Sequence, residues 1–110
     1  MTTDIGALTK RAWSVHQRHL NRARIGEPGS EGDTRFLALA LCGEAGELAN
    51  KIKKLWRGDN PGPTREEVAK EIGDTLNYLI LLAESMNIDP VEEADKALTE
   101  YESRFLKGTQ

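Results

Sequence analysis

Two stretches of the chain decide its fold: residues 41–55, LCGEAGELANKIKKL, and residues 68–82, VAKEIGDTLNYLILL. Apolar residues recur in both at intervals of three and four, which is the spacing of an amphipathic helix. The first stretch has one apolar stripe, and the second has a matching stripe with further apolar residues around much of its C-terminal half. A helix that is apolar on several sides must be buried on several sides, so the second stretch predicts a central helix.

Clusters of glycine and proline divide the chain into four helical segments. The expected helices span approximately residues 4–24, 34–57, 65–86 and 90–106. We expect Thr64 to cap the third helix and Asp89 to cap the fourth, because each precedes an acid or a proline at the spacing typical of a helix start. Asp33 or Thr34 is the expected cap of the second helix. No stretch has the pattern of a β-strand.

The fold class that follows is all-α: a four-helix bundle-like single domain over residues 1–110. A chain of 110 residues, 38% of them hydrophobic, is enough for one domain with a modest core. Helical proteins of this size often complete their core by association with copies of themselves. We therefore expect a homodimer or a homotetramer.

Net charge and hydropathy exclude some classes of partner. The formal net charge of -3 does not favour a nucleic-acid polymer, since proteins that bind one usually carry a clustered basic surface. No stretch approaches the roughly 18 uninterrupted apolar residues of a membrane span. The N-terminal stretch lacks the apolar core of a signal peptide, so the cytoplasm is the expected location.

Four acidic residues occupy equivalent places on the two central helices. Each helix carries two acids three residues apart, and each acid of the second pair lies 27 residues after its counterpart in the first: Glu44 and Glu47, then Glu71 and Asp74. At about 100° per residue, both pairs border their apolar stripes. If the two helices pack together, all four carboxylates converge at the edge of the interface.

Converging carboxylates need a compensating cation. Two of them about 4 Å apart repel by a few kcal/mol at an effective dielectric near 20. Oxygen ligands select hard ions, so Mg²⁺ is the expected cofactor and Mn²⁺ a possible substitute. The alternative from spacing alone is four solvated acids in ordinary surface ion pairs. A di-iron carboxylate bundle is disfavoured, because neither acid pair includes a histidine.

The residues around these acids resemble a known family. The segments Gly43-Glu44-Ala45-Gly46-Glu47-Leu48 and Glu71-Ile72-Gly73-Asp74, followed by Tyr78, resemble the MazG-like and dCTP pyrophosphatase-like branches of the all-alpha nucleoside triphosphate pyrophosphatases. The resemblance covers roughly residues 34–106. It implies Mg²⁺-dependent hydrolysis of a nucleoside or deoxynucleoside triphosphate to the monophosphate and pyrophosphate, in a housecleaning role, with all four acids as metal ligands.

Further site residues follow from helical position and from this resemblance. Glu47 is the expected general base by analogy, although no sequence feature separates it from Glu44. The remaining candidates contact the substrate: Lys51 and Lys54 its phosphates, Tyr78 its sugar or base, Trp56 its base by stacking, and Lys96 from the C-terminal segment. His16 and His19 have no partner cluster in the sequence, so we expect both to be partly exposed.

Two other functions remain open at this point. The chain can be a non-catalytic interaction module in which the apolar central helix binds a partner and the acids are solvated. It can also be a related enzyme specific for dUTP or phosphoribosyl-ATP. The sequence does not identify the base, the sugar, the number of metal ions or the role of residues 26–33.

Overall fold

The computed structural model describes residues 4–19 and 27–106. They form four α-helices and a π-helical segment: α1 (Ile5–His19), α3 (Glu31–Arg57), α4 (Arg65–Ser85), α5 (Pro90–Tyr101) and η1 (Glu102–Leu106). No strand occurs among the described residues, so the all-α prediction is confirmed. The predicted continuation of the first helix to residue 24 lies outside them. No helix in the described part is long and apolar enough to cross a membrane.

Side-chain caps fix where three helices begin. Thr64 accepts a hydrogen bond from the backbone N–H of Glu67, and Asp89 accepts from two N–H groups at the start of α5, as predicted. The predicted cap of the second helix was wrong. Ser30 caps α3 instead, by accepting from the backbone N–H of Asp33 at 3.2 Å, so this helix begins three residues earlier than expected.

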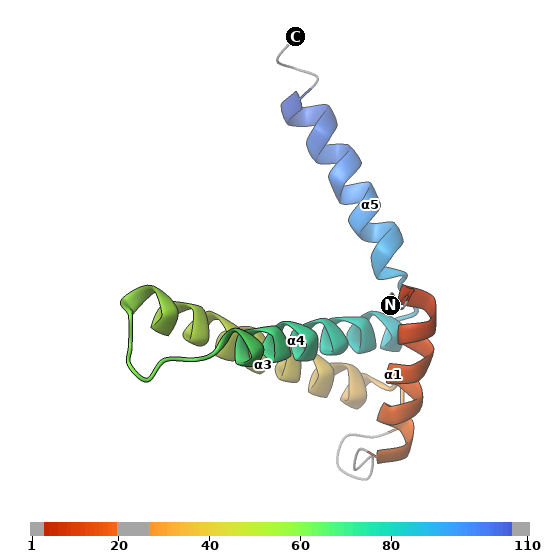
Figure 1. Ribbon diagram of the computed structural model, residues 1–110. Helices are drawn as coiled ribbons and strands as arrows, with labels where there is room; N and C mark the ends of the chain where they lie inside the picture. Colours follow the sequence, from red (N-terminus) through yellow and green to blue (C-terminus); the bar gives the residue numbers. More distant parts are fainter. Residues whose placement is uncertain (1–3, 20–26, 107–110) are drawn as a thin grey trace.

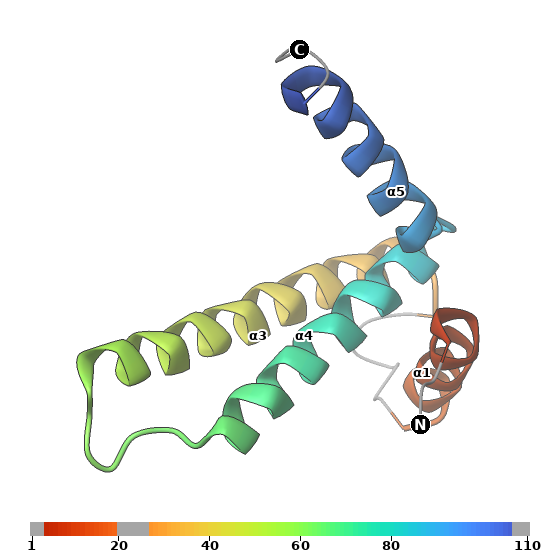
Figure 2. The ribbon, with the colours of Figure 1, turned by 45° about the horizontal axis from the view of Figure 1, so that its top comes forward.

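Gly58 ends α3 and turns the chain back toward α4. Its φ of 73° lies in the left-handed region that favours glycine, and its N–H donates to the carbonyl of Leu55 at 3.1 Å. Residues 58–64 then lead into α4, which returns antiparallel to α3 (Figure 2). This helical hairpin brings the two acid-bearing segments side by side.

The core lies where α1 crosses the C-terminal half of α4 (Figure 1). Its buried apolar side chains come from α3 and α4: Leu37, Ile80, Leu81 and Ala83. Because α4 packs against both α1 and α3, it is the central helix that the sequence predicted.

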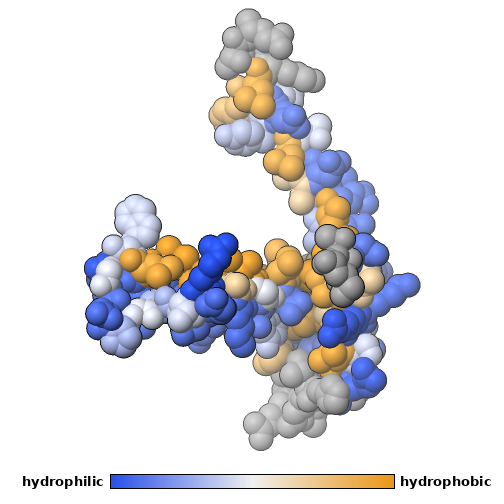
Figure 3. All heavy atoms as spheres, in the orientation of Figure 1, coloured by the Kyte–Doolittle hydropathy of each residue, from blue (hydrophilic) through white to orange (hydrophobic). Residues whose placement is uncertain are grey.

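α5 extends away from the other helices (Figures 1 and 2). The radius of gyration of 17.1 Å exceeds the ~13 Å of a compact domain of this length, which reflects that open arrangement. Figure 3 shows apolar side chains on α5 and along the edge of the α3–α4 hairpin, both turned into the same open angle. The large apolar side chains exposed on α4 and α5 are Ile72, Leu76, Leu79, Val91, Leu98 and Tyr101. One chain therefore leaves much of its apolar surface uncovered.

Candidate metal centre

Three acids from the two halves of the hairpin form a cluster. Glu44 and Glu47 come from α3 and Glu71 from α4, and one carboxylate oxygen of each lies within 4.8 Å of those of the other two. We call these three residues the acid cluster. The three-residue spacing places Glu44 and Glu47 one helical turn apart, so both point across the interface toward α4. The predicted convergence of these acids is thus present in the structure.

Asp74, the fourth acid of the prediction, lies beside the cluster without joining it. It follows Glu71 by one turn on α4, and its Oδ2 accepts a hydrogen bond from Lys70 Nζ at 2.9 Å. Its negative charge still contributes to raising the pKa of Glu44. Asp74 therefore borders the acid cluster while being paired toward solvent.

Two buried oxygens of the cluster have no partner. The Oε2 atoms of Glu44 and Glu71 are inaccessible to solvent and accept no hydrogen bond. A buried acceptor without a donor costs free energy, about 1–3 kcal/mol for a typical group. Inward-facing carboxylate oxygens with unused lone pairs are the donor set that Mg²⁺ and Mn²⁺ prefer, so the residues fit the predicted ion.

The acids differ in how readily they hold a proton. Hydrogen bonding with Glu71, burial and the negative charges of Glu71, Asp74 and Glu47 all raise the pKa of Glu44. The hydrogen bond from Lys51 lowers the pKa of Glu71, with help from the hydrogen bond to Glu44. The ammonium group of Lys51 therefore offsets part of the negative charge that gathers here, and the acids that surround Glu44 favour its protonated form relative to an isolated glutamate.

Lys51 bridges the two helices of the hairpin. It lies one turn after Glu47 on α3, and its Nζ donates to Oε1 of Glu71 on α4 at 2.9 Å. Glu71 is buried, whereas 27% of the Lys51 side chain is exposed. Lys54 lies a further turn along α3, half-buried, where its charge helps to lower the pKa of Asp59. Of the two predicted phosphate ligands, Lys51 is the one in direct contact with the acid cluster.

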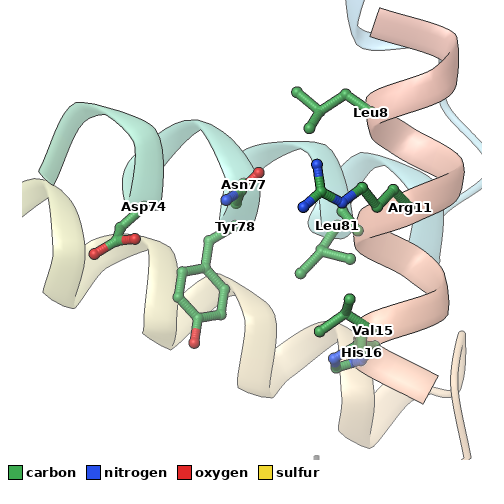
Figure 4. Close-up of a pocket in the computed structure, with 9 residues that line it drawn as sticks. Leu8, Arg11, Val15, His16, Asp74, Asn77, Tyr78 and Leu81 are labelled. Carbon is green, nitrogen blue, oxygen red and sulfur yellow. The ribbon is translucent and has the colours of Figure 1, made fainter. Parts of the chain in front are cut away.

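A cavity of about 410 Å³ between α1 and α4 adjoins this region (Figure 4). Asp74 and Tyr78 line its end nearest the acids, and Figure 4 shows Arg11 reaching from α1 toward Asn77 on α4. Apolar side chains form most of the remaining wall: Leu8, Ala12, Val15 and Leu81. Its size and its mixture of an apolar wall with a few polar groups are typical of small-molecule sites.

Two predicted substrate contacts lie elsewhere on the chain. Trp56 stands in the last turn of α3 with 91% of its surface exposed. Lys96 lies on α5, where its Nζ forms ion pairs with Glu92 at 3.3 Å and Glu93 at 3.2 Å. The single chain does not bring either residue to the acid cluster, and their roles stay predictions.

One feature beside the cavity, a buried hydrogen-bonded pair of side chains, was not predicted from the sequence. His16 on α1 and Asp33 on α3 are 1% and 0% exposed, and a hydrogen bond of 2.7 Å joins His16 Nε2 to Asp33 Oδ1. The expectation that His16 is partly exposed was therefore wrong, and the side chain of His19 lies outside the described residues. Seventeen residues separate the partners, so helical periodicity does not connect them. Arg11 and Asn77 were missed as cavity residues for the same reason.

Comparisons with known proteins identify the family of this chain. The model of the MazG nucleotide pyrophosphohydrolase domain family matches residues 33–105. The chain is also similar to the Gene 37 protein of Mycobacterium phage L5, with 32% identity over 77 residues that cover 66% of this chain and 67% of that protein. No solved structure matches. The matched region begins at the start of α3 and includes the whole acid cluster.

Proposed function

The chain belongs to the MazG nucleotide pyrophosphohydrolase family, and we propose that it hydrolyses a nucleoside triphosphate to the monophosphate and pyrophosphate with bound magnesium. The observation that carries the proposal is the acid cluster with its two unpartnered buried oxygens. A solvated group of acids, as in an interaction module, has no need to bury carboxylate oxygens without donors.

Glu44, Glu47 and Glu71 are the proposed metal ligands, and Asp74 joins them when it turns away from Lys70. When bound, magnesium supplies positive charge for the phosphate oxygens and increases the acidity of a bound water. The protein's part is to hold the α-phosphorus and this water in line.

Glu47 is the proposed general base. The carboxyl group of Glu44 lies beside that of Glu71 and is half-buried, Glu71 accepts from Lys51, and Asp74 accepts from Lys70. Glu47 makes no hydrogen bond or ion pair with any described residue, and its side chain is exposed. A carboxylate with a free oxygen at the open side of the cluster is placed to accept a proton from the attacking water.

The cavity between α1 and α4 is the proposed site for the nucleoside part of the substrate. Asp74 lines this cavity and also borders the acid cluster. When the phosphates of a nucleotide lie at the acids, its sugar can lie beside Tyr78 and its base in the apolar part of the cavity. Lys54 lies on the opposite side of the cluster, where it can contact the outer phosphates. The base and the choice between ribose and deoxyribose follow from the shape of this cavity, and dUTP and phosphoribosyl-ATP remain candidate substrates.

A second copy of the chain is the proposed partner. The apolar surfaces of α4 and α5 face the same open angle, so helices of one partner can cover both (Figure 3). Such packing also places α5 of one copy, with Lys96, next to the hairpin of the other. A homodimer and a homotetramer can each cover these apolar surfaces.

The same uncovered surface favours the rival function, a non-catalytic interaction module. The deciding experiment is release of pyrophosphate from a panel of nucleoside and deoxynucleoside triphosphates, with dUTP and phosphoribosyl-ATP included, at saturating magnesium. We expect release by the native chain, and a loss of at least about 100-fold for Glu47→Ala and Asp74→Ala.

Glu84→Gln is the matched control, because it removes one exposed carboxylate near the C-terminal end of α4, remote from the acid cluster. Circular dichroism establishes that each variant is folded. If no nucleotide releases pyrophosphate, or if both alanine variants keep full activity, the non-catalytic interaction module becomes the favoured function.

A further inference from the structure

Lys51 is placed between two possible ligands. Its Nζ is bound to a buried carboxylate of the acid cluster, yet about a quarter of its side chain is open to solvent. While Glu71 accepts from this ammonium group, the positive charge of Lys51 is shared between that carboxylate and any phosphate that a second N–H group contacts. An event that moved the ammonium group away from Glu71 would leave its full charge for the phosphate.

A metal ion bound by the acid cluster is such an event. Glu71 Oε1 is the atom that accepts from Lys51, and Glu71 Oε2 is one of the two unpartnered buried oxygens. A divalent cation bound by the Glu71 carboxylate would neutralise the negative charge that holds Lys51. The cation would also repel the ammonium group of Lys51, which lies within 3 Å of Glu71 Oε1. The exposed part of the side chain allows it to turn outward, toward the place where substrate phosphates approach.

We propose that Lys51 is an exchangeable counter-ion: it occupies the acid cluster in the metal-free protein and is released by the metal to bind the substrate's phosphate groups. This inference rests on the proposed function and adds an order of events. Magnesium binds first and releases Lys51, which then contacts the phosphates. Metal and nucleotide then favour each other's binding through one side chain. Lys51 is thus a positioning residue for the metal and a binding residue for the phosphates.

The test compares Lys51→Met with Lys53→Met, a neighbour on α3 that loses the same charge without touching the acids. Magnesium is titrated calorimetrically into the metal-free proteins without nucleotide. We expect Lys51→Met to bind magnesium about tenfold more tightly than the native chain, because the ion no longer displaces a charged hydrogen bond. Lys53→Met should differ from the native chain by less than about twofold, the small effect of an exposed charge.

Thermal unfolding gives a second readout that does not depend on activity. In EDTA, the melting temperature of Lys51→Met should be lower than that of the native chain, because the variant lacks the ion pair between α3 and α4. In saturating magnesium the two melting temperatures should be equal, since the metal then supplies the missing positive charge. Lys51→Gln, which keeps a polar end, serves in place of Lys51→Met if the latter does not fold.

The phosphate half of the proposal is tested with inorganic pyrophosphate in saturating magnesium, where Lys51→Met should bind about tenfold more weakly than Lys53→Met. Equal or weaker magnesium binding by Lys51→Met, or a melting deficit that persists in magnesium, would overturn the exchange while leaving the proposed function standing. Absence of magnesium binding to the native chain would overturn both.

Discussion

His16 on α1 and Asp33 on α3 form a hydrogen-bonded pair of 2.7 Å in the interior of the protein. The second oxygen of Asp33 accepts from the backbone N–H of Gly29 at 2.8 Å, so this carboxylate joins α1, the start of α3 and the turn before it. The pair fixes α1 in its position across α4, and α1 supplies one wall of the cavity.

Removal of His16 should therefore destabilise the protein strongly. His16→Leu leaves the buried Asp33 carboxylate with one partner fewer, and breaking a buried pair in this way costs about 3–5 kcal/mol. Urea unfolding measures the change. The double variant His16→Leu with Asp33→Leu should lose less stability than the sum of the two single variants, since neither buried polar group then remains without the other. Strict additivity would show that the pair is not coupled.

Glu44→Gln should stabilise the metal-free protein while abolishing metal binding. The raised pKa of Glu44 means that the folded protein holds its proton more tightly than the unfolded chain does, so stability falls as pH rises from about 4.5 through the raised pKa. Glutamine never acquires that charge. In EDTA the melting temperature of Glu44→Gln should exceed that of the native chain at pH 8 and approach it near pH 4.

Glu47→Gln is the control for this comparison, because it removes an exposed carboxylate of the same cluster. It should change the melting temperature in EDTA less than Glu44→Gln does. A Glu44→Gln variant that is less stable than the native chain at pH 8 would contradict the prediction.

Ala12→Phe should obstruct the cavity without disturbing the acid cluster. Ala12 lines the cavity from α1, and a phenyl ring there occupies the space proposed for the nucleoside. We expect kcat/KM for the preferred nucleotide to fall about 10- to 100-fold, while magnesium binding is unchanged. Ala7→Phe, an exposed position on the same helix, should retain activity. Retained activity in a folded Ala12→Phe variant would place the nucleoside elsewhere.

Leu76→Glu should separate the copies of the chain. Leu76 is 44% exposed on the apolar face of α4, between Ile72 and Leu79. A charge buried at an interface costs several kcal/mol, enough to shift an association constant by 100-fold or more at roughly 1.4 kcal/mol per tenfold. Sedimentation equilibrium should show an oligomer for the native chain and a monomer for Leu76→Glu. The average molar mass of Leu76→Ala should lie between these two. Unchanged mass in the glutamate variant would reject a subunit interface at this face.

Features encoded within one helix were predictable from the sequence. The apolar stripe of α4 and the caps at Thr64 and Asp89 depend on residues within a few positions of each other, so their spacing carries the information. The pairing of the acids across α3 and α4 was also predictable, because a short loop forces the two helices to return side by side.

Features that join distant segments were not predictable. The pairing of His16 with Asp33 depends on the angle at which α1 crosses the hairpin, and the orientation of Asp74 toward Lys70 depends on side-chain rotamers. The cap at Ser30 was missed because Asp33 and Thr34 are equally good capping residues by type. In the structure, Asp33 is already engaged with His16 and Gly29.

The hairpin of α3 and α4 contains the whole acid cluster within residues 31–85. Its long-range contacts close across one short loop, and such local topologies form rapidly because little chain entropy is lost before the first contacts are made. We therefore expect the acids to assemble early in folding, before α1 docks on α4. A chain that has just formed this hairpin already holds its acid cluster in register, whatever packs on it afterwards.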